Sequence, residues 1–294
     1  MKIEFWGVRG TSPAPDADKT RYGGNTNCVV VTSQDAPGHY FILDAGTGLA
    51  RFGATLSYAH AHNSTVLLSH LHLQHIIGFQ FTPFAFGKAY KTHVIGPSPR
   101  DMLLEKVFDT IMEPNYSPVY GIANLLAQVK FDEVDSQLRQ VGNVSFIGLP
   151  FEHSQNTLSW GYRLEDKSGS MVYLVDTVLY DPDGSLAQAG IRLSYNVDVL
   201  IVGADVPYHL PDGTNNTYAT GIALARASHA KHLYLYHHDP LMSDDELDAM
   251  QARLREENPD IQLTMAAERM VIDLEKSAAT SDRRATSELP RLEI

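Results

Sequence analysis

The chain has 294 residues, 44% hydrophobic and 20% charged, so it can bury a sizeable core as one large domain or two average ones. Its formal net charge is −12. This charge argues against binding duplex nucleic acid over a broad surface, which requires clustered lysine and arginine. It does not exclude a small anionic substrate, because a bound dication inverts the local field.

The single cysteine, Cys28, rules out an intrachain disulfide and fits a reducing compartment. It precedes a run of three valines, so we expect a buried small residue rather than a nucleophile. The N-terminus carries an acid at Glu4 and lacks a long apolar core. No run approaches the roughly 20 apolar residues of a membrane span. We therefore expect a cytoplasmic protein that does not bind membranes.

Apolar runs predict strands over residues 2–7, 28–32 and 40–43 in the first part of the chain. Residues 7–13 are rich in turn formers and are predicted to be a loop. The third strand ends at Asp44, which either faces a site or ties down a turn, and the pattern favours neither. A further strand is predicted to end near residues 66–68.

Three histidines, His70, His72 and His75, lie within six positions directly after that strand. Neutral imidazole binds zinc, iron and manganese, and the short spacing lets one backbone turn direct several rings at one point. The alternative is a solvated loop that happens to be rich in histidine. The pattern favours a metal site.

Residues 79–135 are less informative. Four phenylalanines at 79, 81, 84 and 86 could stack a base, although packing beside a core is the favoured reading. A strand is predicted over 91–95. Ser98 is predicted to cap a helix with Pro99 at its first position, and Pro114 to end it.

In the second half, three buried strands each lead into a polar candidate: 144–150 into His153, 171–175 into Asp176, and 232–236 into the pair His237 and His238. A strand is also predicted over 197–202 and a helix over 220–230. Ser243 and Glu246 form a capping box that opens a helix over 244–257. Residues 261–264 and 270–274 are predicted to add a last strand pair. Residues 276–294 are predicted to be a disordered tail or linker.

The segment His-Leu-His-Leu-Gln-His at 70–75 resembles the His-x-His-x-Asp-His signature of the metallo-β-lactamase fold hydrolases. The phrases Phe-Trp-Gly-Val-Arg-Gly-Thr-Ser-Pro at 5–13, Tyr-Gly-Gly-Asn-Thr-Asn-Cys at 22–28 and Leu-Asp-Ala-Gly-Thr-Gly at 43–48 are similar to the branch with ribonuclease Z-like and cyclic-nucleotide phosphodiesterase-like proteins. The resemblance covers about residues 1–275. It implies one αββα domain, with two mixed β-sheets flanked by helices, and a homodimer.

The resemblance also implies the ligands. His70, His72 and His153 would hold one metal, and His75 and His237 a second, with Asp176 between them; His238 is the alternative to His237. Zinc is the expected metal, with manganese or iron as alternatives. Two dications about 3.5–4 Å apart can bind a phosphate and activate a water.

Two departures from the signature concern the second metal and the proton donor. Gln74 replaces the family's Asp, and Asn216 is the nearest match to a histidine that donates a proton to the leaving group. The second metal is therefore doubtful, and the candidate catalytic residues are Asp176, Gln74 and Asn216. Arg9, Asn25 and Thr26 are candidate substrate-binding residues; Arg9 and Lys91 could equally be surface cations.

Two functions follow from the resemblance. The first is a phosphodiesterase that hydrolyses a cyclic nucleotide or similar small phosphodiester through metal-activated water. The second is a catalytically impaired member that binds a nucleotide or partner protein as a sensor or regulator. The first predicts chelator-sensitive hydrolysis, and the second predicts binding without product.

Overall fold

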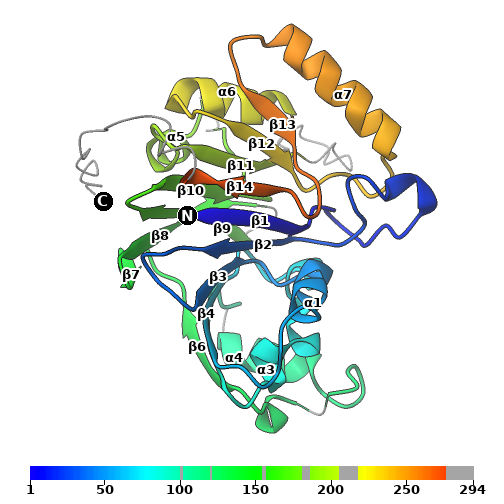
Figure 1. The fold of residues 1–294 in the computed structure, drawn as a ribbon, viewed down its shortest axis with the longest axis vertical. Helices are drawn as coiled ribbons and strands as arrows, with labels where there is room; N and C mark the ends of the chain where they lie inside the picture. Colours follow the sequence, from blue (N-terminus) through cyan, green and yellow to red (C-terminus); the bar gives the residue numbers. More distant parts are fainter. Residues whose placement is uncertain (100–101, 120, 154–156, 181–185, 205–217, 276–294) are drawn as a thin grey trace.

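The computed structural model describes residues 1–99, 102–119, 121–153, 157–180, 186–204 and 218–275. Two seven-stranded sheets lie face to face, and helices cover the outer side of each (Figure 1). The αββα fold predicted from the sequence is confirmed. Asn216 and the tail predicted over 276–294 lie outside the described residues.

The first sheet contains both ends of the described chain. Its strands β1, β2, β3 and β14 are antiparallel neighbours, whereas β3 to β6 run parallel, with helices in the connections between them. The order across the sheet is β14 (Val271–Asp273), β1 (Lys2–Gly7), β2 (Cys28–Thr32), β3 (His39–Leu43), β4 (His62–Leu67), β5 (Tyr90–Gly96) and β6 (Gln128–Glu133).

The second sheet is also mixed. Strands β7 to β10 are antiparallel, and β10 to β13 are parallel. The order across the sheet is β13 (Leu263–Met265), β12 (Leu233–Tyr236), β11 (Val199–Gly203), β10 (Gly169–Leu174), β9 (Leu158–Asp166), β8 (Val144–Glu152) and β7 (Arg139–Val141).

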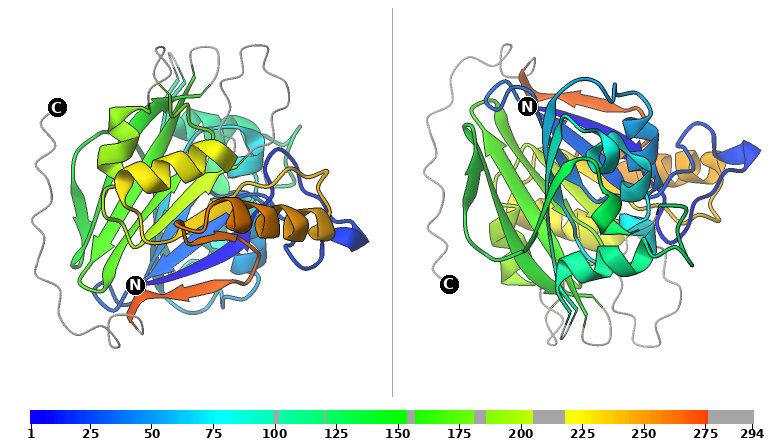
Figure 2. Two further views of the ribbon diagram at one scale, coloured as in Figure 1. Left: turned by 90° about the horizontal axis from the view of Figure 1, so that it is seen from above. Right: turned by 90° about the horizontal axis from the view of Figure 1, so that it is seen from below.

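The helices form two outer layers, which the two views of Figure 2 show from opposite sides. The first sheet is covered by α1 (Thr47–Gly53), α3 (Pro83–Phe86) and α4 (Leu104–Ile111), and the short α2 (Leu73–Ile76) follows β4. The second sheet is covered by α5 (Gln188–Leu193), α6 (Tyr218–Ser228) and α7 (Asp244–Glu257). Short 3-10 helices span Ala17–Lys19, Phe79–Phe81 and Ile122–Asn124. Within the described part of the chain, none of the helices is both long enough and apolar enough to cross a bilayer.

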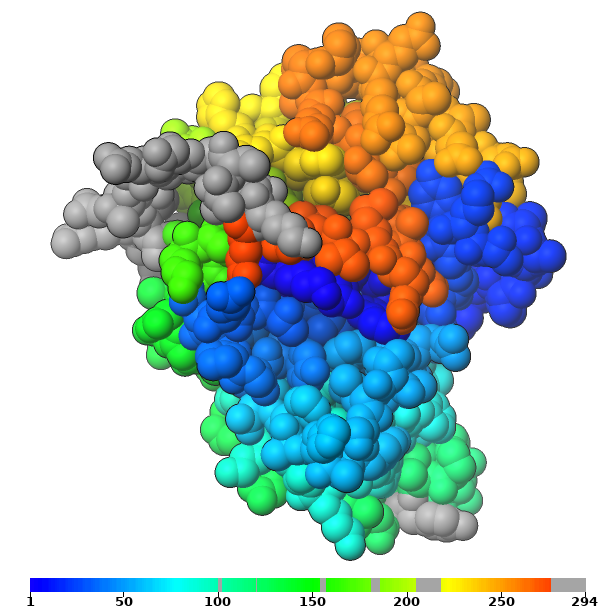
Figure 3. Space-filling model, viewed as in Figure 1, coloured from blue at the N-terminus to red at the C-terminus, as the bar shows by residue number. Residues whose placement is uncertain are grey.

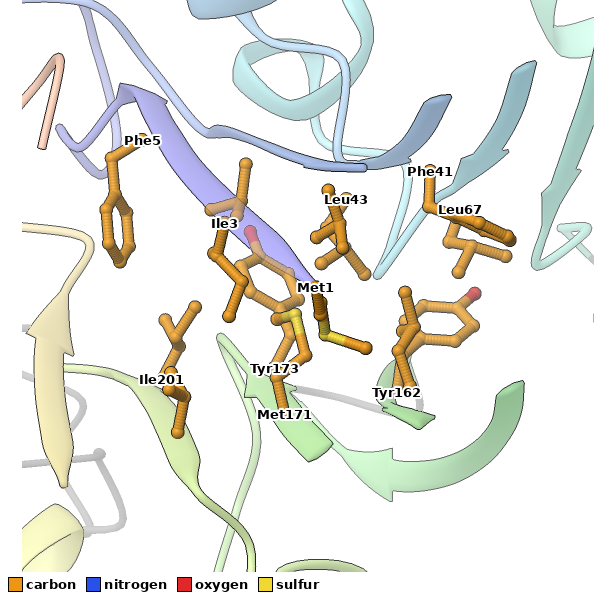
Figure 4. Close-up of a cluster of buried hydrophobic side chains, with 14 of the residues drawn as sticks. Met1, Ile3, Phe5, Phe41, Leu43, Leu67, Tyr162, Met171, Tyr173 and Ile201 are labelled. Atoms are coloured by element: carbon orange, nitrogen blue, oxygen red, sulfur yellow. The ribbon is translucent and has the colours of Figure 1, made fainter. Parts of the chain in front are cut away.

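The central core fills the space between the sheets. Alternate residues of β1, such as Ile3 and Phe5, point inward and are fully buried, as the two-residue period of a strand requires. They meet side chains from the opposite sheet, including Met171, Tyr173 and Ile201 (Figure 4). This packing fixes the strands whose ends carry the polar candidates.

Most predicted elements are confirmed, with small shifts of their ends. The two strands predicted near residues 261–264 and 270–274 are confirmed as β13 and β14, but they do not pair with each other, because β13 joins the second sheet and β14 pairs with β1 in the first. Figure 3 shows the orange C-terminal strand beside the dark blue N-terminal strand. Short apolar runs carry no information about which sheet edge they join.

The predicted helix start at Ser98 is also wrong. Helix α4 begins at Leu104, with Leu103 as its N-cap residue and no side-chain cap. In contrast, the capping box of Ser243 and Glu246 is present at the start of α7. A capping residue therefore predicts where a helix begins only if the residues after it form the first helical turn.

Candidate metal centre

The six candidate ligands lie where the ends of both sheets meet. His70 and His72 follow β4, and His75 lies in α2. The other three follow strands of the second sheet: His153 after β8, Asp176 after β10 and His237 after β12. Strands β4, β10 and β12 are largely buried, and each stops shortly before a segment that carries candidate ligands.

Three residues at these strand ends have left-handed backbones. Asp44, Asp176 and His237 have φ angles of 60°, 49° and 62°. A positive φ is uncommon for residues other than glycine, and such conformations cluster at functional sites. Each turns the chain sharply after its strand and directs its side chain into the centre.

The first group of donors consists of His70, His72 and His153. The Nε2 atom of His70 lies 2.9 Å from Nδ1 of His72, and one nitrogen from each of the three rings lies within 4.8 Å of the others. Within the described residues, the Nε2 atom of His153 is buried with no hydrogen-bond partner. Buried polar atoms in native proteins are nearly always partnered, so this nitrogen is free for a ligand such as a metal ion.

The second group surrounds the carboxylate of Asp176. Its Oδ2 atom lies 3.2 Å from Nε2 of His75, 3.2 Å from Nε2 of His237 and 3.4 Å from Nε2 of His70. Zinc bonds of about 2.0–2.1 Å in a tetrahedron place neighbouring donors roughly 3.3 Å apart. The residues therefore fit a metal ion, and Asp176 stands between the two groups.

The electrostatics keep the rings of the first group neutral. Burial lowers the pKa of His70 well below 6.5, and it also lowers the pKa of His72 and of His153. Burial opposes the ionisation of Asp176, but His237 and the other histidines outweigh it and hold its pKa well below 3.8. Neutral imidazoles in the first group and an ionised carboxylate at Asp176 are the ligand forms that a metal ion requires.

His75 is held in place from behind. The net pKa of His75 is raised, because Asp44 and Asp176 outweigh the effect of its burial. Asp44 is fully buried and accepts hydrogen bonds from the backbone and hydroxyl of Ser69 and from the hydroxyl of Tyr173. The amide nitrogen of Asn27 lies 3.2 Å from Nε2 of His75.

These supporting residues were only partly predictable. Asp44 was a candidate with two readings, and the structure combines them, because Asp44 contacts His75 and also ties down the turn at Ser69. Nothing in the sequence distinguished Asn27 or Tyr173. Tyr173 lies on an apolar strand, where a tyrosine normally signals packing alone.

Gln74 lies between His72 and His75 and is half-buried. Its backbone carbonyl accepts a hydrogen bond from Thr26, at 2.7 Å from Oγ1. Its side-chain amide makes no hydrogen bond within the described parts of the chain. The segment therefore contributes three histidines to the centre and no carboxylate.

The candidate substrate-binding residues are engaged within the protein. Arg9 is fully buried, and its guanidinium donates to the carbonyls of Gly23, Asp239 and Met242, so the reading as a surface cation is wrong. Asn25 donates to Glu268. Thr26 is buried between Thr47 and Gln74. These contacts hold loops together. Substrate binding by Arg9, Asn25 and Thr26 stays a prediction.

Two remaining alternatives are placed by the structure. Nε2 of His238 hydrogen-bonds the carbonyl oxygen of Ala266, whereas His237 faces Asp176. Lys91 is exposed at the start of β5, at the opposite end of the sheet from the centre, and is a surface cation. Of the four phenylalanines, Phe79 and Phe84 are fully buried in packing.

No family model and no curated protein sequence matches the chain. Its structure is similar to the metallo-β-lactamase fold protein YhfI from Bacillus subtilis, with 18% identity, a TM-score of 0.65 and coverage of 92% of this chain and 99% of YhfI. It is also similar to a diphosphatase from the PhnP family, with 16% identity, a TM-score of 0.62 and coverage of 92% of this chain and 96% of the diphosphatase. A third similar structure is the short form of human tRNase Z, with 18% identity, a TM-score of 0.60 and coverage of 93% of this chain and 99% of the tRNase.

Proposed function

From its metallo-β-lactamase fold and its convergent donors, we propose that this chain is a metal-dependent hydrolase acting on a small phosphodiester. The observation that carries the proposal is the donor spacing around Asp176. His70, His72 and His153 would hold one ion, and His75, Asp176 and His237 a second. A bound dication would supply the positive charge that polarises a phosphoryl oxygen and acidifies a water.

Similar structures support a phosphodiester substrate, and the donor types support zinc as the metal. Two of the similar structures are named for phosphate chemistry, one as a diphosphatase and one as a tRNase. The motifs at 5–13 and 22–28 favour a cyclic nucleotide within that class. Donors consisting of imidazole and carboxylate suit zinc. The protein's own contribution is to hold the rings of His70, His72 and His153 neutral, to orient His75 and to keep Asp176 ionised.

The test starts from protein stripped with a chelator and then reloaded with Zn²⁺ or Mn²⁺. We expect hydrolysis of bis(p-nitrophenyl) phosphate or of a cyclic nucleotide to disappear on stripping and to return on reloading. His72→Ala should lower the rate by about a hundredfold, because losing even a partner that orients a metal ligand costs about 10–100-fold in activity. The matched control is His60→Ala, at another exposed histidine outside the centre. Equal loss in both variants would contradict the proposal.

A second candidate function is binding without turnover, and Gln74 is the observation that favours it. The amide brings no negative charge to the second group of donors, so only the first group would be filled tightly. This candidate predicts metal and nucleotide binding by calorimetry with no product. A protein that binds no metal would contradict both functions.

A further inference from the structure

Three large apolar side chains are exposed beside the metal centre. Leu73 is 57% exposed, Leu158 is 48% exposed and Tyr180 is 41% exposed. Leu73 directly follows His72, Leu158 opens the strand after His153, and Tyr180 lies four residues after Asp176. Single exposed apolar residues are ordinary on protein surfaces, but three that flank three different ligands are not scattered.

The position of Leu158 follows from the strand pairing. Leu158 and Trp160 lie on the same face of β9, and Trp160 packs against the core between the sheets. The backbone N–H of Trp160 donates to the carbonyl of Ser69, 2.8 Å away, directly before His70. Leu158 therefore lies about 7 Å farther along the inner face, toward the loop that carries the three histidines.

The other two side chains, Leu73 and Tyr180, lie on segments that are also held beside the histidine loop or the end of β8. Leu73 is the first residue of α2, for which His72 is the N-cap residue. The backbone N–H of Val178 donates to the carbonyl of Glu152, 2.6 Å away, which holds the segment leading to Tyr180 beside the end of β8. Glu152 is also the cross-strand partner of Leu158.

The approach to the centre lies on this side. His72 is exposed, whereas His70, His75 and His237 are buried. The three exposed apolar side chains on this side therefore offer apolar contact to the part of a substrate that does not react.

We propose that Leu73, Leu158 and Tyr180 form an apolar collar that binds an uncharged aromatic group on the substrate. This inference rests on the proposed function, because it assigns the substrate class of the same centre. Ligand sites commonly surround a few polar groups with apolar contacts. The diester preferred by this centre carries an aromatic substituent within reach of its phosphate.

The test compares two diesters that release the same p-nitrophenolate: phenyl p-nitrophenyl phosphate and methyl p-nitrophenyl phosphate. We expect the ratio of kcat/KM, phenyl over methyl, to fall about tenfold in Leu73→Ser and in Leu158→Ser, since hydrophobic contacts in a site discriminate on this scale. The matched control is Leu138→Ser, because Leu138 is 58% exposed and lies on the loop before β7. It should keep the wild-type ratio.

A second arm measures binding without turnover. Calorimetry with the Zn²⁺-loaded protein compares diphenyl phosphate with dimethyl phosphate. A Kd for diphenyl phosphate that rises about tenfold in the collar variants alone would support the collar even if no diester is hydrolysed, in which case the proposed function fails by itself. Turnover with unchanged ratios in every variant, or binding without a preference for diphenyl phosphate, would overturn the collar.

Discussion

The Nδ1 atom of His75 lies 2.7 Å from Oδ2 of Asp44, and both side chains are fully buried. A carboxylate accepts hydrogen bonds, so Nδ1 carries a proton, and Nε2 is the nitrogen that can bind a metal ion when the ring is neutral. Nε2 faces Asp176 at 3.2 Å. Asp44 thereby selects the tautomer in which His75 can bind a metal ion, as carboxylates commonly do behind metal-binding histidines.

Asp44→Asn should therefore weaken metal binding. Both carboxylate oxygens of Asp44 accept hydrogen bonds, from Ser69, Tyr173 and His75. In asparagine an NH₂ group replaces one of these oxygens, and it would face a donor instead of accepting a hydrogen bond. We expect a tenfold to hundredfold loss of affinity for Zn²⁺, the usual effect of removing such a partner. Competition with a chromophoric chelator measures it.

Asp132→Asn is the matched control for this prediction. Asp132 lies 2.7 Å from Nε2 of His93, in a pair of the same chemistry outside the metal centre. This variant should leave the affinity unchanged. Equal affinity in the Asp44 variant and the wild type would show that the tautomer of His75 does not depend on the carboxylate.

Two buried tyrosines allow a comparison of stabilities. The hydroxyl of Tyr173 donates to the carboxylate of Asp44, and that of Tyr162 donates to the backbone carbonyl of Leu68, each at 2.7 Å. Hydrogen bonds to charged groups contribute about 1.5–3 kcal/mol and neutral ones about 0.5–1.5 kcal/mol. Tyr173→Phe should therefore lower the urea midpoint more than Tyr162→Phe. The reverse order would indicate that Asp44 is satisfied without Tyr173.

The fold was predictable because its strands are apolar runs that stop at polar residues. Residues 2–7 and 28–32 were predicted with the ends that the structure shows, since turn formers flank both strands. Strand β6 lay in the uninformative stretch 79–135, and β7, just after it, was not predicted, because the residues of both strands are mixed and half-exposed at sheet edges. Edge strands carry a weak apolar pattern.

The ligand set was predictable for a related reason, while its support was not. Each candidate ligand follows a buried strand or belongs to the histidine cluster. The contacts of Asn27, Tyr173 and Ser69 join residues separated by up to 129 positions. Such contacts depend on how the two sheets pack, and no local pattern in the chain encodes them.

The free energy of unfolding should fall as the pH is lowered, because protonation of His232 favours the unfolded chain. Burial, with a smaller effect from the charge of Arg255, lowers the pKa of His232 to about 4. In the unfolded chain the pKa is about 6.5. Between these values the unfolded chain binds a proton that the folded chain does not, so the stability present above pH 6.5 is lost as the pH falls toward 4.

His232→Gln removes this proton and retains an amide that can bind Thr264, the partner of Nε2 at 2.9 Å. We expect the urea midpoint of the variant to fall less between pH 7 and pH 4.5 than that of the wild type. The exposed His60→Gln should follow the wild-type curve. If all three proteins lose the same amount, His232 is not the source of the acid sensitivity.

The last prediction concerns the charge that Gln74 does not supply. Its side chain is half-buried between two ligand histidines and forms no hydrogen bond in the described structure, so a carboxylate could be accommodated there. The wild-type protein should hold about one tightly bound metal ion per chain or fewer, because charge on the ligands tunes affinity. Gln74→Asp should raise the content toward two.

The alternative is that the side chain at position 74 faces away from the centre. Mass spectrometry after equilibration with limiting Zn²⁺ measures the metal content per chain and decides between the two. The control is Gln137→Asp, which adds the same charge on an exposed loop and should bind no additional ion. The ligands His70, His72 and His153 are unchanged in both variants, so the first ion should remain. Two ions already present in the wild type, or no gain in Gln74→Asp, would show that the missing carboxylate does not limit the second group of donors.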